Sequence, residues 1–338
     1  MRNGKKVIDM HNHSYTRAWL DYIAKRTQDP LYEWTGPSSG VFKVAGVIAG
    51  HVDKAGDYDV AARVADLDEH GIDTQIVTHT CPGVAEIPVK ESIPWAKRIN
   101  DALAEYCQKY PGRFYFLATF PPENMDEALK EIDRAYKDLG AKGLQMYSNV
   151  NGELASSEKF YPIYERAAEY GLPVKIHPAF RPLTAEAMKQ AKLPLQMYGF
   201  TRDTTMAVTA MIFQGLFEKL PKLKMIHSHL GGMTPYMMGR VDNAFHRFAK
   251  EWGIEIRRLP SETYKEHIYI DTLSLHVPAI RCASEFMGTD HLMFGTDYPH
   301  RASGTVADNL EILEKLGFSE AEKTKVLSEN AVKLFNLK

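Results

Sequence analysis

The chain has 338 residues, a formal net charge of −2 at pH 7 and 44% hydrophobic residues, a composition typical of a protein with a substantial core. This near-neutral charge gives no electrostatic reason to expect nucleic acid or an anionic membrane as a partner. Three cysteines are too few for a disulfide framework and favour a reducing compartment. No apolar run is long enough for a membrane span or a signal peptide, so we expect a soluble cytoplasmic protein.

Short apolar runs alternate with amphipathic stretches along the whole chain. Strands are predicted at residues 6–13, 74–81, 113–120, 142–148, 173–180, 224–231, 268–274 and 292–299. Apolar residues at three- and four-residue spacing predict helices between them, for example over 59–71, 93–110, 123–140 and 156–171. Parallel neighbours need a crossover helix, so this order predicts one α/β domain over 1–338, a (β/α)8 TIM barrel. A doubly wound open sheet is the alternative.

Two longer irregular stretches interrupt this alternation. They cover about residues 16–57, after the first predicted strand, and residues 181–202, after the fifth. In a barrel, both insertions would emerge at the carboxyl ends of the strands, where loops build active sites. We expect them to form lids or walls of a substrate site.

The first predicted strand ends in two histidines, in the stretch VIDMHNHSY. Alternate side chains of a strand share a face, so His11 and His13 would lie about 6–7 Å apart along the chain on one side. That spacing allows both imidazoles to reach one metal ion.

Further histidines and one aspartate end later strands. His177 ends the fifth strand, His227 and His229 end the sixth, and Asp297 ends the eighth. In a barrel, these positions converge on one rim. Three imidazoles and a carboxylate suit a divalent transition metal such as zinc, with manganese or iron as alternatives.

The motifs HxH, HP, HLGG and GTDYPH, in this order, resemble those of the amidohydrolase superfamily. More narrowly, they resemble the branch related to α-amino-β-carboxymuconate-ε-semialdehyde decarboxylase, whose members include decarboxylases of hydroxylated benzoic acids. The likeness runs from the first strand to the last helix, SENAVKLFNL. It implies that the metal ligands are His11, His13, His177 and Asp297.

The same resemblance implies roles for residues around the metal. His229, before x-Gly-Gly, would be the catalytic acid or base, and Asp297 could also transfer the proton. Arg240, in PYMMGRV, matches an arginine that binds a substrate carboxylate, and an ordinary ion pair is its alternative role. The motif does not require His227, which is predicted one pleat before His229 on the same face of the strand. We expect His227 to support the ligands from behind, with contact to the substrate as the alternative.

The resemblance also bears on the number of metals and on assembly. Binuclear relatives carry a bridging lysine at the end of the fourth strand, where this chain has Gln145 and Tyr147, so one metal ion is expected. We expect Zn²⁺, with Mn²⁺ as the alternative. Relatives are often dimers or larger, so a homo-oligomer is also expected.

The reaction implied is non-oxidative decarboxylation of an aromatic, hydroxybenzoate-type acid or of a carboxymuconate-like acid. Metal-dependent hydrolysis of a lactone, amide or ester, or hydration of a double bond, would use the same ligands and remains open. Lys175 should share the inner face of its strand with His177. Because a buried ammonium needs a partner, we expect Lys175 to pair with Asp9 or Asp271.

Overall fold

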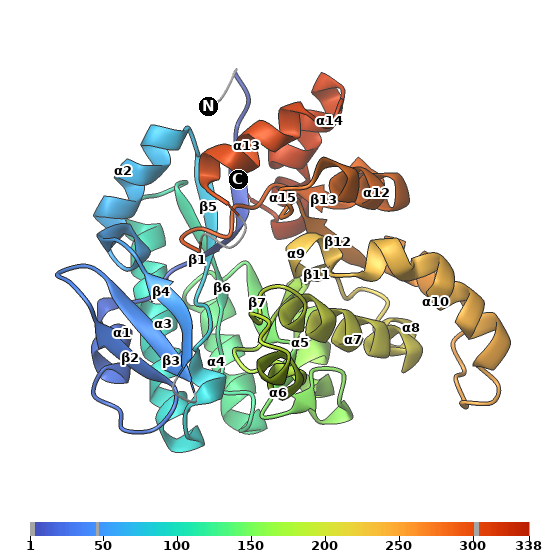
Figure 1. Ribbon diagram of the computed structural model, residues 1–338, viewed down its shortest axis with the longest axis horizontal. Coiled ribbons are helices and arrows are strands. Elements are labelled where there is room, and N and C mark those ends of the chain that lie inside the picture. The colour runs from blue at the N-terminus through green and yellow to red at the C-terminus, as the bar shows by residue number, and fades with distance from the viewer. Residues whose placement is uncertain (1–3, 45–46, 301–303, 338) are drawn as a thin grey trace.

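Eight parallel strands form the centre of the molecule in the computed structural model, which describes residues 4–44, 47–300 and 304–337 (Figure 1). They lie side by side in chain order, which is the order of a barrel: β1 (Ile8–His13), β5 (Thr74–Thr78), β6 (Phe114–Ala118), β7 (Gly143–Tyr147), β10 (Val174–His177), β11 (Met225–His227), β12 (Ile268–Asp271) and β13 (Leu292–Met293). The amide of Met10 donates to the Phe294 carbonyl at 3.0 Å, which brings the end of the sheet back to β1. The (β/α)8 TIM barrel expected from the sequence is therefore confirmed.

Helices follow the strands and surround the barrel (Figure 1). They are α2 (Val60–His70), α3 (Val89–Lys109), α4 (Met125–Lys137), α5 (Tyr161–Tyr170), α7 (Gly199–Phe213), α8 (Leu216–Lys219), α9 (Ser228–Gly231), α10 (Thr234–Phe248), α11 (Pro260–His267), α12 (Val277–Met287), α13 (Val306–Glu314), α14 (Glu320–Thr324) and α15 (Asn330–Phe335). Local sequence explains their ends. In α4, the Asn124 side chain accepts a hydrogen bond from the Glu127 amide, and basic residues occupy the last turn.

The core has two parts. The larger one fills the space between the sheet and the helices. The smaller one lies inside the barrel, where Ile8, Met10 and Ile226 pack with Phe335 of α15. This apolar packing seals the barrel next to α15, so polar side chains inside the barrel gather toward the carboxyl ends of the strands.

The first insertion is more regular than the sequence suggested. It contains α1 (Arg17–Ile23) and an antiparallel sheet of β2 (Leu31–Trp34), β3 (Gly40–Val44) and β4 (Val47–Val52). The ring of Phe42, on β3, packs against that of Tyr15 and that of Tyr32 on β2, with centroids 5.0 and 4.8 Å away. Burial of these rings ties the sheet to the barrel mouth, a tertiary effect that periodicity does not reveal.

The second insertion contains the short helix α6 (Ala185–Gln190) and leads into α7. A small hairpin of β8 (Asn149–Val150) and β9 (Glu153–Leu154) precedes α5. Among the described helices, none combines the length and the apolar character that a bilayer crossing requires.

Candidate metal centre

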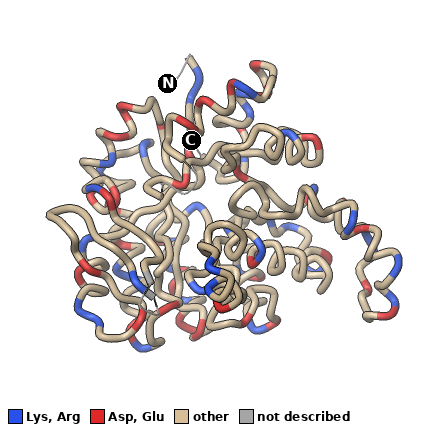
Figure 2. Tube along the Cα trace, in the orientation of Figure 1, with Lys and Arg blue, Asp and Glu red and all other residues tan. Residues whose placement is uncertain are grey.

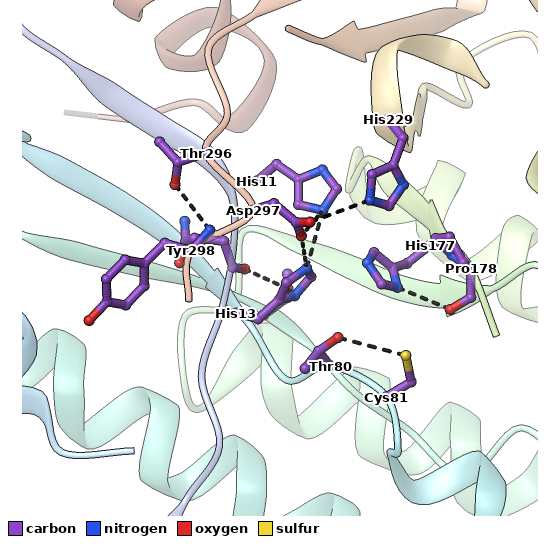
Figure 3. Close-up of polar contacts among 12 residues, drawn as sticks. His11, His13, Thr80, Cys81, His177, Pro178, His229, Thr296, Asp297 and Tyr298 are labelled. Carbon is purple, nitrogen blue, oxygen red and sulfur yellow. Dashed lines mark hydrogen bonds and ion pairs between the residues drawn. The ribbon is translucent and has the colours of Figure 1, made fainter. Parts of the chain in front are cut away.

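Four strand ends bring histidines and one aspartate together at the barrel mouth (Figure 3). The Nε2 atoms of His11 and His13 lie 3.2 Å apart, and they lie 3.5 and 3.2 Å from Asp297 Oδ1. The ring of His177 has its centroid 4.6 Å from that of His13. Residues from β1, from the end of β10 and from beyond β13 therefore meet at one point, as the strand-end pattern predicted.

The second ring nitrogen of each of these histidines, Nδ1, lies within hydrogen-bond distance of another protein group. The Nδ1–H of His11 donates to Asp271 Oδ2 at 2.6 Å, and His177 Nδ1 lies 3.1 Å from the Pro178 carbonyl. The Thr78 hydroxyl donates to the Asn12 carbonyl, so its oxygen is free to accept from His13 Nδ1–H at 2.8 Å. With Nδ1 protonated, each Nε2 presents a lone pair to the centre, the arrangement that histidine metal ligands adopt.

The electrostatics keep these imidazoles neutral. Burial, reinforced by the charge of Lys175, lowers the pKa of His11 to about 4, against the opposing effect of Asp271. Burial also lowers the pKa values of His13 and His177 well below the usual histidine range. Neutral imidazole is the form that binds a metal ion, so proton competition at neutral pH is weak.

The donor set fits a metal ion. Ligand atoms of His11, His177, His229 and Asp297 all lie within 4.8 Å of one another. The Nε2 atom of His177 is buried and has no hydrogen-bond partner in the described part of the chain. A buried, unsatisfied nitrogen facing other donors is expected where an ion binds. This group contains His229 in place of His13, which the motif implied as the fourth ligand. The geometry therefore leaves two candidates for the fourth ligand position.

His229 lies in a left-handed turn directly after β11, rather than on the strand. Its φ is +58°, and that of Leu230 is +56°. The carboxylate of Asp271 accepts their two amides, at 2.8 and 2.7 Å. The cost of such a backbone, about 1–3 kcal/mol per residue, is thereby offset.

The two glycines of HLGG complete this turn, and the structure explains why they are small. A Cβ on Gly231 would lie 2.6 Å from the Tyr264 hydroxyl, and one on Gly232 would lie 2.8 Å from the Thr201 carbonyl. Both glycines also have positive φ, +73° and +59°. The turn therefore depends on the full motif, and it aims His229 into the mouth.

Asp297 shares the unusual backbone of His229, with φ of +57°, and lies four residues beyond the end of β13. His229 Nε2 is 3.8 Å from Asp297 Oδ2. Burial alone would raise the pKa of Asp297, but contacts with His13 and His229 hold it well below its usual range. The aspartate is therefore ionised, as a ligand must be.

A cavity of about 270 Å³ opens beside these residues. Residues of both insertions line it, in agreement with the expectation that the insertions form walls of a substrate site. The described lining comprises Gly50, His51, Asp53, Thr80, Cys81, His177, Gln196, Phe200, Thr201, His229, Asp297, Pro299 and His300. Periodicity had no signal for His51, Asp53, Gln196 or Thr201, which enter through the insertions.

His227 is not among the described residues that line this cavity, and, contrary to the prediction from the strand pattern, it does not share a face with His229. Its predicted role, behind the ligands or in contact with the substrate, stays a prediction. His227 is fully buried, and its ring nitrogens lie 3.0 Å from the hydroxyls of Tyr264 and Thr204. These partners belong to α11 and α7, on the helix side of the sheet. The predicted shared face is wrong because His229 leaves the strand, so the two histidines do not lie on one pleat.

Arg240 is an exposed residue of α10, outside the residues that line the cavity. Its expected contact with a substrate carboxylate stays a prediction. Gln145 lies on β7, which is buried and contains no lysine. The strand therefore carries no residue that could bridge two metal ions as the lysine of binuclear relatives does.

Lys175 is fully buried, as expected, but it has no hydrogen bond, and no carboxylate of the described residues lies within ion-pair distance. Asp9 instead accepts hydrogen bonds from Gln75 and Thr296, and Asp271 binds His11. The predicted direct pair is therefore wrong. Longer-range attraction to Asp271, Asp297 and Asp9 only partly offsets burial, which lowers the pKa of Lys175 to about 8.

The barrel and the cluster of histidines and aspartate at its strand ends place this chain in the class of metal-dependent barrel proteins. The family model described as Amidohydrolase matches residues 8–337, and the chain belongs to that family. The resemblance read from its motifs is thereby confirmed.

Named relatives share this architecture. A gamma-resorcylate decarboxylase of a Polaromonas species is 30% identical over 292 residues, which cover 81% of this chain and 86% of the relative. The 2-amino-3-carboxymuconate-6-semialdehyde decarboxylase of Dictyostelium discoideum is 29% identical and covers 83% of this chain and 77% of its own length. A solved structure of 5-carboxyvanillate decarboxylase from Novosphingobium aromaticivorans, complexed with manganese and 4-hydroxy-3-methoxy-5-nitrobenzoic acid, is 27% identical with a TM-score of 0.87. It covers 99% of this chain and 97% of its own.

Proposed function

We propose that the protein is a metal-dependent decarboxylase of a hydroxylated aromatic acid. The observation that carries the proposal is the convergence of neutral imidazoles and an ionised aspartate on one cavity, in a chain similar to enzymes named as decarboxylases of such acids. Small carboxylic acids are the substrates that those names imply. The family match over 8–337 supports a single domain over 1–338.

The proposed ligands are His11, His13, His177 and Asp297, with one divalent ion. Imidazole and carboxylate donors suit Zn²⁺, our first choice, and Mn²⁺, which the named structure of a relative contains. When bound, the ion would act as a Lewis acid that holds the substrate carboxylate and a neighbouring oxygen.

The protein groups at the cavity then transfer the proton. His229 Nε2 and Asp297 Oδ2 lie 3.8 Å apart, so an inserted substrate can contact both. One of them, after taking up a proton from the substrate hydroxyl or from solvent, gives that proton to the ring carbon that bears the carboxylate. The bond to the carboxylate carbon then breaks, carbon dioxide leaves, and the electron pair returns to the ring. Positioned proton transfer of this kind contributes about 10²–10⁴-fold.

Assembly and location complete the proposal. The exposed position of Arg240 on α10 supports a homo-oligomer in which a neighbouring subunit supplies it to the site. Three free thiols, Cys81, Cys107 and Cys282, support the cytoplasm as its compartment.

The test is carbon dioxide release by the purified, metal-loaded protein from 2,4- and 2,6-dihydroxybenzoate, with lactones and esters assayed in parallel. We expect decarboxylation that a chelator abolishes and added metal restores. Hydrolysis of a lactone or ester without release of carbon dioxide from any acid would reject the proposal.

A further inference from the structure

A second cavity of about 660 Å³ adjoins the candidate metal centre, and its volume exceeds that of the first, about 270 Å³. Ligand sites commonly have volumes of about 300–1,000 Å³, so the first cavity accommodates little more than one substituted ring. The second offers room that a simple hydroxybenzoate would leave unused.

The two cavities are continuous along two walls. On β4, Gly50 and His51 line the first cavity, and Ile48 and Ala49 line the second. On the other wall, Gln196 lines both cavities. The sheet of the first insertion and the α6 segment of the second thus line one channel that leads away from the metal centre.

The walls of the second cavity are mainly apolar. Phe180 is 5% exposed and packs in the core, whereas Ile48 is 56% exposed and Leu193 is 37% exposed. Exposed aliphatic side chains that face a common hollow favour an apolar ligand group, because contact would remove them from water.

Basic side chains surround these apolar walls. Lys189, Lys192 and Arg181 line the cavity together with one acidic residue, Glu186. Arg181 lies 4.0 Å from Asp29, but neither lysine forms an ion pair within the part of the chain that is described. Elsewhere acidic and basic residues are interspersed over the molecule (Figure 2). The rim of the second cavity therefore complements an anion.

We propose that the second cavity is a substrate subsite for an apolar arm on the aromatic acid, and that this arm ends in an anionic group. This inference deepens the proposed function and rests on it. The carboxylate that is lost would lie at the metal centre, the arm would pass Gln196 and contact Ile48 and Leu193, and its terminal anion would meet Lys189 and Lys192.

Binding of decarboxylated products tests the subsite without requiring turnover. Calorimetry with the metal-loaded enzyme would compare resorcinol with resorcinols that carry, at the 4- or 5-position, a pentyl or a 5-carboxypentyl arm. We expect the pentyl arm to tighten binding at least tenfold, from burial of its methylene groups, and the terminal carboxylate to tighten it further.

Variants separate the two parts of the subsite. Ile48→Asp should remove most of the gain from the pentyl arm. The double change Lys189→Glu and Lys192→Glu should remove the gain from the terminal carboxylate and leave that of the pentyl arm. Lys250→Glu, which changes an exposed lysine outside both cavities, should leave all these affinities unchanged. Circular dichroism and melting curves confirm that each variant is folded.

Two results would overturn the inference. One is equal affinity for resorcinol and every armed resorcinol, in an enzyme that decarboxylates dihydroxybenzoates, which leaves the proposed function intact. The other is a stable dimer that Ile48→Asp dissociates, because a second copy would then cover these side chains. Tight, lysine-dependent binding of the armed ligands without any decarboxylation would instead support the subsite and reject the proposed function.

Discussion

The carboxylate of Asp271 connects the ring of His11 to the backbone of His229. One of its oxygens accepts from His11 Nδ1–H at 2.6 Å and from the His229 amide at 2.8 Å. Burial alone would raise the pKa of Asp271, but its interactions with His11, with His229 and with the Leu230 amide lower it to about 2. A single charged group therefore orients a proposed metal ligand and also holds the turn that carries the proposed proton donor.

Asp271→Asn should weaken metal binding by about 10–100-fold, because an amide nitrogen facing Nδ1 disrupts the orientation of the His11 ring. Competition with a chromogenic chelator measures the affinity. Asp290→Asn, which changes an exposed aspartate paired with Lys325, is the matched control. Unchanged affinity in Asp271→Asn would show that this hydrogen bond does not orient a ligand.

His13→Ala and His229→Ala distinguish the two candidates for the fourth ligand position. We expect His13→Ala to lose bound metal, measured by elemental analysis after dialysis. His229→Ala should keep its metal but lose about 10²–10⁴-fold in kcat, because it removes positioned proton transfer. The opposite pattern would exchange the roles of the two histidines.

The metal-free protein should lose stability as the pH falls from about 6.5 to 4. Burial lowers the pKa of His11 to about 4 and those of His79 and His227 to about 3. Between pH 6.5 and 4 the unfolded chain therefore binds more protons than the folded chain, which favours unfolding. Each such histidine contributes about 1.4 kcal/mol per pH unit within this window.

Buried carboxyls oppose this effect, because burial raises the pKa values of Asp9 and Asp57 to about 6 and that of Glu86 to about 7. They are fewer than the buried histidines, which also include His13 and His177. Urea unfolding in a chelator at pH 6.5, 5.5 and 4.5 measures the balance. A midpoint that stays constant or rises toward pH 4.5 would contradict the prediction.

Lys175 should make the stability of the metal-free protein depend on pH in the alkaline range. Its pKa of about 8 lies below the usual lysine value, so between pH 8 and 10 the unfolded chain holds more protons than the folded one. Stability of the metal-free wild type should therefore rise with pH relative to Lys175→Met, by about 1.4 kcal/mol per pH unit. Parallel stability curves for the two proteins would show that Lys175 is not buried as a charge.

The replacement His227→Phe should reduce stability and spare the chemistry. It leaves the hydroxyls of Tyr264 and Thr204 without their buried partner, which costs about 1–3 kcal/mol. Chemical denaturation measures this loss. A large rise in KM for the acid, with unchanged stability, would restore the substrate contact that the sequence suggested.

The sequence predicted every barrel strand, because each one is a short apolar run between amphipathic helices. It also predicted that His11, His13, His177, His229 and Asp297 would meet, since parallel strands end at one rim. Strand periodicity failed for His227, because it assumes that the strand continues to His229. The chain instead enters a left-handed turn there, which the hydrogen bonds from the amides of His229 and Leu230 to Asp271 stabilise.

The insertions were harder to predict. Their β-sheet is stabilised by packing of Phe42 against both Tyr15 and Tyr32, and the sequence alone does not reveal which aromatic rings meet. The same is true of Lys175, whose position was correct but whose partner was not. Asp9 and Asp271 were already bound by Thr296 and His11, a competition that only the packed structure reveals.

The barrel joins its first strand to the segment that follows its last, so the proposed metal donors come from both extremes of the chain. A ribosome-bound nascent polypeptide has His11 and His13 long before Asp297 is synthesised. The complete set of donors cannot form until Asp297 has been synthesised, so loading with metal has to follow translation of the last barrel strand. A product truncated before the last strand would keep several histidines and yet bind the ion poorly, so metal content would report whether the segment with Asp297 is present.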